Sequence, residues 1–369
     1  MIREIEIVNG SIPLTKTDPE QLWTEEWSSQ LFVKIVTEET NTGWGEVLPA
    51  GGNSRDPYVP LISRFRDLLN GRDEADYCAL WNVMRRATFT GGYGITTGAI
   101  SGVDIALWDI MGRRANVSLA KMFGGGERKV KRYASLARYK DSETLLKLCE
   151  RLLSKGYAAI KMHQSSSDTL ESVALVRKSL GNNFDLMVDL NCAYSFEKAR
   201  EFMRGVERYD LKWIEEPVWP PDDYHSLKKL NKLGPVAAGE NFFSVFEFKR
   251  LLDEDALTYY QPDVAKIGGL TPAEELATLF KIYGADVAFH NRPHNGWVGT
   301  LASANLVSGM GLSDWMIETP PNEIPLEYFD FSGTIDQTGL EPRGAGLGIS
   351  PKNNIPTSKT SKLLKFHED

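Results

Sequence analysis

The sequence predicts an α/β protein built on a (β/α)7β barrel, a modified TIM barrel, with an N-terminal α+β capping domain. Two observations favour this fold. From about residue 130 onward, short apolar runs alternate with amphipathic stretches of 10 to 15 residues, the pattern of βα units around a parallel sheet. Before residue 125 that alternation is missing, and a hairpin pattern precedes a long apolar helix.

The first part of the chain, residues 1–125, is expected to form the capping domain. Within it, SSQLFVKIVTEETNTGWGEV (28–47) predicts two antiparallel strands joined by a polar turn. The segment AISGVDIALWDIMGRRA (99–115) predicts a helix. Most of the apolar surface of that helix comes from Ile100, Val103, Ile105, Leu107 and Ile110.

The second part, residues 126–320, is expected to form the barrel. Helical periodicity separates its strands, as in SETLLKLCERLLSKG and TPAEELATLFKIYG, and glycine often ends such a stretch. Residues 321–369 lack the periodicity of another barrel unit and are expected to return to the capping domain. The eight predicted strands are KRYASL, AAIKMH, LMVDLN, LKWIEE, VAAGEN, TYYQPDV, ADVAFH and WMIE.

The composition is that of a globular protein and excludes several classes of partner. The chain has 369 residues, 42% hydrophobic and 25% charged, and its 42 Lys+Arg against 50 Asp+Glu give a net charge of −8. Without a run of basic residues, neither nucleic acid nor an anionic membrane is expected as a partner. The cysteines Cys78, Cys149 and Cys192 have no C-x-x-C spacing, which argues against a structural zinc site and a disulfide framework. No signal peptide or membrane span is predicted, so a cytoplasmic location is expected.

Acidic residues end three consecutive predicted strands. Asp189, Glu215 and Glu240 follow one another at intervals of about 25 residues. Because the carboxyl ends of barrel strands meet at one rim, three carboxylates would gather there, which is costly unless a cation neutralises them. A single acid after a strand is more often a helix cap, but three in register predict a metal site. Oxygen ligands alone favour Mg²⁺ or Mn²⁺ over Zn²⁺.

Basic residues end the neighbouring predicted strands. Lys161 and His163 end the second strand, and their spacing of two places both side chains on the same face. Asp263 ends the sixth strand and His290 ends the seventh. A carboxylate beside an imidazole fixes its tautomer and raises its basicity. A lone histidine at the rim is usually structural, whereas this pair opposite a metal site predicts a proton-transfer dyad.

These motifs together resemble the enolase superfamily, specifically the mandelate racemase-like branch of the mandelate racemase/muconate lactonizing enzyme family. The resemblance covers nearly the whole chain, and the interval of 27 from Asp263 to His290 is similar to that branch's Asp-His dyad. It implies that Asp189, Glu215 and Glu240 bind Mg²⁺. The motifs that carry it occur in order: GWGE, SGVDIALWDIMGRRANVSLAKMFGG, VDLN, WIEEP, GEN and PDVAKIGGLT.

The resemblance also implies roles for other residues. Lys161 would lie beside the substrate carboxylate, and His163 stands where many members have a second lysine that acts as a base. Because the reference pKa of His is about 6.5 against 10.4 for Lys, His163 could be a base without strong pKa depression, or could only bind substrate. Lys266 matches a base position of the muconate-lactonizing branch, a role that the dyad makes less favourable here. Expected substrate-binding residues are Asn191, Glu216 (next to a metal ligand), Lys266, His294 and Glu318.

The chemistry that the resemblance implies is abstraction of the proton α to a carboxylate, through an enediolate that a divalent metal stabilises. We expect dehydration of a sugar acid, an aldonate or aldarate, to a 2-keto-3-deoxy acid, because the loops at 49–58 and 290–297 are rich in hydrogen-bonding groups. A racemase, epimerase or cycloisomerase using the same intermediate is the alternative. A further alternative is a catalytically silent binding protein. The presence of the triad, the dyad and Lys161 argues against it. The expected partners are a small-molecule carboxylate substrate and further copies of the chain in a homo-oligomer.

Overall fold

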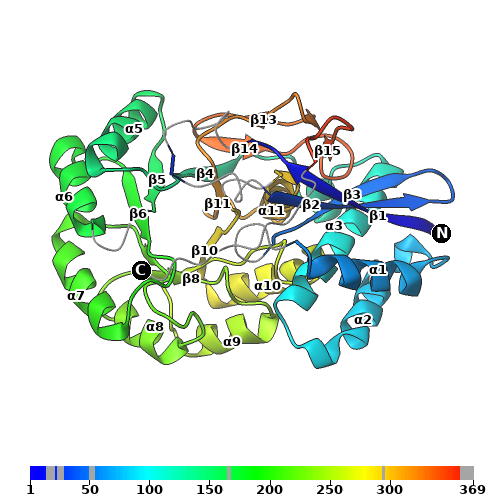
Figure 1. Cartoon of the computed structure of the whole chain (residues 1–369), viewed down its shortest axis with the longest axis horizontal. Coiled ribbons are helices and arrows are strands. Elements are labelled where there is room, and N and C mark those ends of the chain that lie inside the picture. Colours follow the sequence, from blue (N-terminus) through cyan, green and yellow to red (C-terminus); the bar gives the residue numbers. More distant parts are fainter. Residues whose placement is uncertain (14–20, 23–28, 50–54, 164–167, 293–295, 358–369) are drawn as a thin grey trace.

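The structure, a computed structural model, describes residues 1–13, 21–22, 29–49, 55–163, 168–292 and 296–357. Figure 1 shows the barrel on the left, in green to orange, and the N-terminal elements on the right, in blue and cyan. Among the helices of the described ranges, none combines the length and the apolar character that a membrane span requires.

A closed parallel barrel forms the larger part of the molecule, as the sequence predicts. Each strand pairs with the next along the chain, and the last pairs with the first to close the barrel. The pairing places Asp189 directly opposite Glu215 at the strand ends. The strands are β4 (Val130–Ser135), β5 (Ala159–Met162), β6 (Asp185–Asp189), β7 (Ile214–Glu215), β8 (Val236–Ala238), β9 (Tyr259–Tyr260), β10 (Asp286–Phe289) and β11 (Met316–Thr319).

Four of the seven α-helices that the structure describes between these strands begin at side-chain caps. Asp141 accepts a hydrogen bond from the Thr144 amide at 2.7 Å, and Ser195, Asp223 and Ser244 cap their helices in the same way. A short helix, η5 (Glu207–Tyr209), follows α7. The helices are α5 (Ser142–Ser154), α6 (Thr169–Leu180), α7 (Phe196–Val206), α8 (Tyr224–Asn231), α9 (Val245–Asp253), α10 (Leu270–Tyr283) and α11 (Val298–Gly309).

A layer of buried side chains fills the barrel below its rim. Ala159, Met187 and Trp213 belong to this layer, together with Tyr133, Ala237 and Ala288. The first three stand two residues before Lys161, Asp189 and Glu215. Because side chains alternate along a strand, the charged residues therefore point into the barrel one layer higher, at its carboxyl end.

The N-terminal part is an antiparallel sheet packed against helices. The predicted hairpin is present as β2 (Ser29–Thr37) and β3 (Thr42–Val47), and β1 (Ile2–Ser11) adds a third strand beside β2. The predicted helix is α3 (Ile95–Ala115), which begins earlier than residue 99. Gly45 in β3 packs so closely on the Gly102 carbonyl of α3 that a Cβ atom would collide with it. The remaining helices here are α1 (Tyr58–Leu69), η3 (Glu74–Asp76), α2 (Tyr77–Ala87), η4 (Phe89–Gly91) and α4 (Leu119–Met122).

The C-terminal segment contacts both parts of the molecule. Its strand β14 (Gly339–Glu341) pairs with β13 (Thr334–Ile335) and with barrel strand β4. The strands β12 (Phe329–Phe331) and β15 (Ile349–Pro351) pair with each other. Leu347 donates its amide to the Asp109 carboxylate of α3 at 2.8 Å. The division of the chain at residues 125 and 320 stays a prediction.

Candidate active site

Three carboxylates meet at the carboxyl ends of β6, β7 and β8. One oxygen atom from each of Asp189, Glu215 and Glu240 lies within 4.8 Å of the other two. Asp189 and Glu215 are buried, and the Glu240 side chain is 15% exposed. Clustered carboxylate oxygens on rigid strand ends, with one of them open to the mouth of the barrel, fit a hard divalent cation such as Mg²⁺ or Mn²⁺.

Lys161 connects two members of this triad to Glu318. Its Nζ atom lies 2.6 Å from Glu215 Oε1, 3.2 Å from Asp189 Oδ2 and 3.0 Å from Glu318 Oε1. Burial alone lowers the pKa of a lysine, but these carboxylates outweigh it and raise the pKa of Lys161 above its usual value. The side chain is therefore an ammonium at neutral pH, fixed at the rim as the sequence predicts.

His163 lies on the same side of the rim as Lys161. Its Nε2 atom is 2.9 Å from Asp189 Oδ2, and its Nδ1 atom donates to the Leu136 carbonyl, 2.6 Å away. Because a carbonyl only accepts, Nδ1 carries a hydrogen, and Nε2 is the atom that can exchange a proton. Burial raises the pKa of Asp189, but Lys161 and His163 outweigh it, so that this pKa lies below its usual value.

The predicted pair of Asp263 and His290 is brought into direct contact. His290 Nδ1 lies 2.6 Å from Asp263 Oδ2, and His290 Nε2 lies 2.8 Å from Glu240 Oε2. The other oxygen of Asp263 accepts the Ala265 amide at 2.7 Å, which fixes the carboxylate. Burial lowers the pKa of His290, but Glu240 and the other nearby carboxylates outweigh it and raise that pKa above its usual value.

The two histidines approach the triad from different sides. His163 contacts Asp189, while His290 contacts Glu240. They come from β5 and β10, which β4 and β11 separate along the shorter way around the barrel. A molecule held at the triad would thus have one imidazole on each flank.

The predicted substrate-binding residues occupy two different places. Glu318, at the end of β11, accepts from the Tyr133 hydroxyl at 3.3 Å and contacts Lys161, so it lies at the rim. Glu216 and Lys266 instead meet at Asn241: its Nδ2 lies 2.9 Å from Glu216 Oε2, and its Oδ1 accepts from Lys266 Nζ at 3.1 Å. Burial raises the pKa of Glu216 to about 8. These two residues therefore support the strand end that carries Glu240.

Asn191 lies beside a cavity at the same rim. The cavity has a volume of about 490 Å³, and Asn191, Glu216, Trp219, Glu240 and Asn241 are among the residues that line it. The Asn191 amide donates to Asp189 Oδ1 at 2.8 Å, which holds that carboxylate. His294 and residues 50–54, from the two loops expected to bind a polyol, lie outside the described residues.

Two residues that the sequence analysis missed hold Glu215 from below. Its Oε2 atom accepts from Trp213 Nε1 at 2.9 Å and from Gln261 Nε2 at 2.6 Å. Trp213 could have been found, because it precedes Glu215 by two residues and shares its face of the strand. Gln261 gives no such local signal, because it follows β9, two strands away in the barrel.

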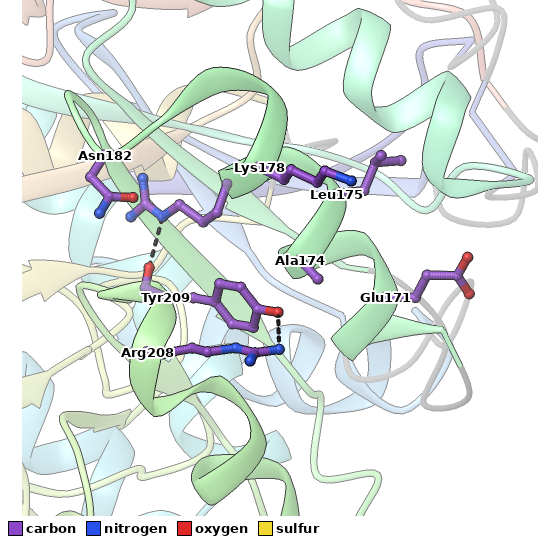
Figure 2. A pocket seen from close by; sticks show the side chains of 8 residues that line it. Glu171, Ala174, Leu175, Lys178, Asn182, Arg208 and Tyr209 are labelled. Atoms are coloured by element: carbon purple, nitrogen blue, oxygen red, sulfur yellow. Dashed lines mark hydrogen bonds between the residues drawn. The ribbon is translucent and has the colours of Figure 1, made fainter.

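A second cavity, of about 570 Å³, lies on the outer surface between α6 and η5 (Figure 2). Its lining residues Asn182 and Tyr209 precede β6 and β7, so it lies at the end of the barrel opposite the triad. The Arg177 guanidinium there donates to the carbonyls of Tyr209 at 2.8 Å and Asp210 at 2.7 Å. This arginine is structural, and the groups suited to catalysis are gathered at the opposite rim.

Two family models match the chain. "Mandelate racemase / muconate lactonizing enzyme, N-terminal domain" matches residues 10–124, and "Enolase C-terminal domain-like" matches residues 144–355. The D-galactonate dehydratase of Klebsiella pneumoniae is 32% identical over 273 residues, which is 70% of this chain and 71% of the relative.

Solved structures of enzymes are similar to the chain over nearly its whole length. The 3,6-anhydro-D-galactonate cycloisomerase from Zobellia galactanivorans has a TM-score of 0.83 and 30% identity, over 95% of this chain and 96% of the other. The L-talarate dehydratase from Polaromonas sp. JS666, complexed with Mg and L-glucarate, has a TM-score of 0.79 and 25% identity, over 96% of each chain.

Proposed function

The chain belongs to the mandelate racemase/muconate lactonizing enzyme family of the enolase superfamily and is an enzyme, and on this premise we propose that it dehydrates a sugar acid. The product would be a 2-keto-3-deoxy acid. The observation that carries the proposal is the pair of imidazoles on two flanks of one carboxylate triad, His163 at Asp189 and His290 at Glu240. Dehydration needs a base for the α proton and an acid for the leaving hydroxyl, and this site has a candidate for each.

Asp189, Glu215 and Glu240 would hold the metal ion, with Mg²⁺ preferred and Mn²⁺ as a substitute. When bound, the ion supplies positive charge for the substrate carboxylate as negative charge develops on its oxygens. The fit rests on their clustered oxygens and on the L-talarate dehydratase structure, which contains Mg. Trp213 and Gln261 direct one oxygen of Glu215 downward, which leaves its Oε1 for the rim.

The first half of the reaction is assigned to the β5 side of the rim. His163 Nε2 takes the α proton in its unprotonated form: Asp189, which lies 2.9 Å from Nε2, would turn to the metal, while the Leu136 carbonyl keeps the Nδ1–H. The Lys161 ammonium lies 2.6 to 3.2 Å from carboxylate oxygens of the rim, where it can stabilise the negative charge that develops on the substrate.

The second half is assigned to the β10 side. His290 donates a proton to the departing β-hydroxyl, and Asp263 holds the Nδ1–H of the same ring. The C–O bond breaks as the enediolate collapses, water leaves, and the resulting enol becomes the 2-keto acid. Burial lowers the pKa of His290, but the carboxylates of Glu240, Glu318 and Asp263 outweigh it and raise that pKa, which favours the protonated ring that this role requires.

A cycloisomerase is the second candidate, and the similarity to the Zobellia galactanivorans cycloisomerase favours it. The same two histidines would serve, but the leaving oxygen would belong to a ring of the substrate, so the ring would open without loss of water. Racemisation or epimerisation would need reprotonation at the α carbon from the opposite face, which the placement of His290 also allows.

A substrate screen tests the proposal. The purified chain is incubated with Mg²⁺ and a panel of aldonic, aldaric and 3,6-anhydro acids, and semicarbazide detects 2-keto acids while NMR detects epimers. A 2-keto-3-deoxy acid from an open-chain acid supports the dehydratase, and turnover of anhydro acids alone replaces it with the cycloisomerase. We also propose that the chain forms a homo-oligomer and that it is located in the cytoplasm. Light scattering of the purified chain tests the oligomeric state.

A further inference from the structure

The end of strand β3 contacts the chain at the start of α11, which follows His290. Glu46, the last but one residue of β3, is fully buried and accepts hydrogen bonds from the amides of Gly296 at 2.6 Å and Gly299 at 2.9 Å. Gly299 lies in the first turn of α11, where backbone N–H groups lack partners within the helix, and Gly296 directly precedes the N-cap Trp297. The Phe32 ring packs so closely on Gly296 that a Cβ atom there would collide with it.

A second contact joins the same two segments nearer to the dyad. Arg292, two residues after His290, donates from Nη1 to the Pro49 carbonyl at 3.0 Å and is 8% exposed. The Tyr58 hydroxyl donates to the Leu48 carbonyl at 3.2 Å, which holds this end of the strand from the other side. Residues 46–49 therefore bind the chain both shortly after His290 and at the start of α11.

We propose that Glu46 and Arg292 form a bracket that positions the His290 imidazole for proton donation, an inference that rests on the proposed function. Both are positioning residues, since they act through the backbone that follows His290, Arg292 close to the ring and Glu46 at the start of α11. The loop 49–58, expected from the sequence to bind the polyol, starts at Pro49, one of the bracket's own contacts. The bracket thus joins Pro49, where that loop begins, to the segment that follows the proposed acid.

The chain offers a matched control in Asp104 of α3. This carboxylate is also fully buried, and it binds the Thr271 amide at 2.9 Å and the Thr271 hydroxyl at 2.6 Å at the start of α10. Burial raises the pKa of Glu46 and of Asp104 alike, each to about 7. Asp104 therefore makes the same kind of contact between capping domain and barrel, but on a helix that does not follow His290.

The first test measures two rates in D2O with a substrate that the wild type turns over: deuterium uptake at the α carbon and formation of product. Glu46→Gln replaces one acceptor oxygen by an NH2 group that cannot accept from an amide. Product formation should fall about 10- to 100-fold, the loss typical of a misplaced catalytic group, while deuterium uptake stays near wild type. In Asp104→Asn the ratio of deuterium uptake to product formation should stay at the wild-type value, even if its thermal midpoint falls by as much as that of Glu46→Gln.

The second test needs no substrate, so it separates this inference from the proposed function. Mass spectrometry measures hydrogen exchange at the C2 position of each histidine ring. Exchange at His290 should become faster in Glu46→Gln and in Arg292→Lys but not in Asp104→Asn, and His163 serves as the internal reference. If Glu46→Gln fails to fold, Arg292→Lys, which keeps the charge, carries both tests.

Two results would overturn the bracket. The first is that both bracket variants, Glu46→Gln and Arg292→Lys, keep the wild-type ratio of deuterium uptake to product formation and the wild-type rate of C2 exchange at His290. The second is an equal change in the Asp104→Asn control, which would reduce Glu46 to general stabilisation of the interface. If the wild type turns over no acid, the C2 exchange still decides the inference.

Discussion

The Nε2 atom of His290 lies 2.8 Å from Oε2 of Glu240. This contact joins the dyad to the carboxylate triad, since the other nitrogen of the ring is held by Asp263 at 2.6 Å. On the opposite flank, His163 is joined to Asp189 in the same way. Variants of either histidine therefore change the surroundings of a proposed metal ligand, so metal affinity and proton transfer have to be measured separately.

Glu240→Gln should abolish turnover while the fold stays intact. The substitution removes one anionic ligand where the charge of the enediolate must be met. Isothermal titration should show weaker Mg²⁺ binding, and circular dichroism should be unchanged. Asp222→Asn is the control, because Asp222 lines the same cavity without belonging to the triad. Near wild-type turnover of Glu240→Gln at limiting Mg²⁺ would remove Glu240 from the ligand set.

Removal of divalent metal should abolish activity without unfolding the chain. The triad lies on strand ends above a packed layer of the barrel, and the Lys161 ammonium neutralises part of its charge. Added Mg²⁺ or Mn²⁺ should restore turnover, and Mg²⁺ at about 100 times its Kd should stabilise the fold by about 2.7 kcal/mol. Full activity in excess chelator would contradict the metal-dependent mechanism.

An isotope experiment should distinguish the catalytic roles of the two histidines. His290→Asn should lower product formation by about 10²-fold or more, because asparagine has a similar shape but cannot relay a proton. It should still take up solvent deuterium at the α carbon, whereas His163→Asn should not. The reverse pattern would make the Asp263 and His290 dyad the base. Wild-type turnover of His290→Asn would reject the dyad altogether.

Loss of the support beneath Glu215 should weaken metal binding. Trp213→Phe keeps the aromatic packing but removes the N–H that lies 2.9 Å from Glu215 Oε2, so the Kd for Mg²⁺ should rise about 10- to 100-fold. Tyr133→Phe is the matched control, since it removes a polar group from the same layer that bonds Glu318 instead. An equal loss of Mg²⁺ affinity in both variants would argue for general repacking of the barrel floor.

Asp104 should make the stability of the chain depend on pH. Burial raises its pKa to about 7, so between the unfolded value near 4 and this folded value the native state binds the proton more strongly. The Asp104 carboxyl therefore stabilises the fold most at low pH. A pKa shift of about three units corresponds to about 4 kcal/mol of folding stability, which is lost as the pH rises to 7. The thermal midpoint of wild type relative to Asp104→Asn should be higher at pH 5 than at pH 8. A difference independent of pH would contradict this assignment.

Much of the fold and many of the residues at the rim were predictable because local sequence patterns specify them. Alternation along single strands predicts that Lys161 and His163 share a face, and the regular length of βα units predicts that Asp189, Glu215 and Glu240 meet at one end of the barrel. The prediction needed no knowledge of how the barrel closes. Strands such as β7 and β9, each of two residues, were still found because their polar ends follow short apolar runs.

The tertiary structure alone decided which of these groups touch. The contact of His290 with Glu240, the bond from Gln261 to Glu215, and the bonds from Glu46 to the start of α11 join residues 46 or more positions apart along the chain. Glu216 and Lys266, expected from the sequence at the substrate, both contact Asn241, and Glu216 also lines the rim cavity, so their binding role stays a prediction. Local periodicity fixes the face on which a side chain lies. Barrel closure and the docking of the capping sheet determine which partner it meets there, because both depend on packing among segments far apart in the chain.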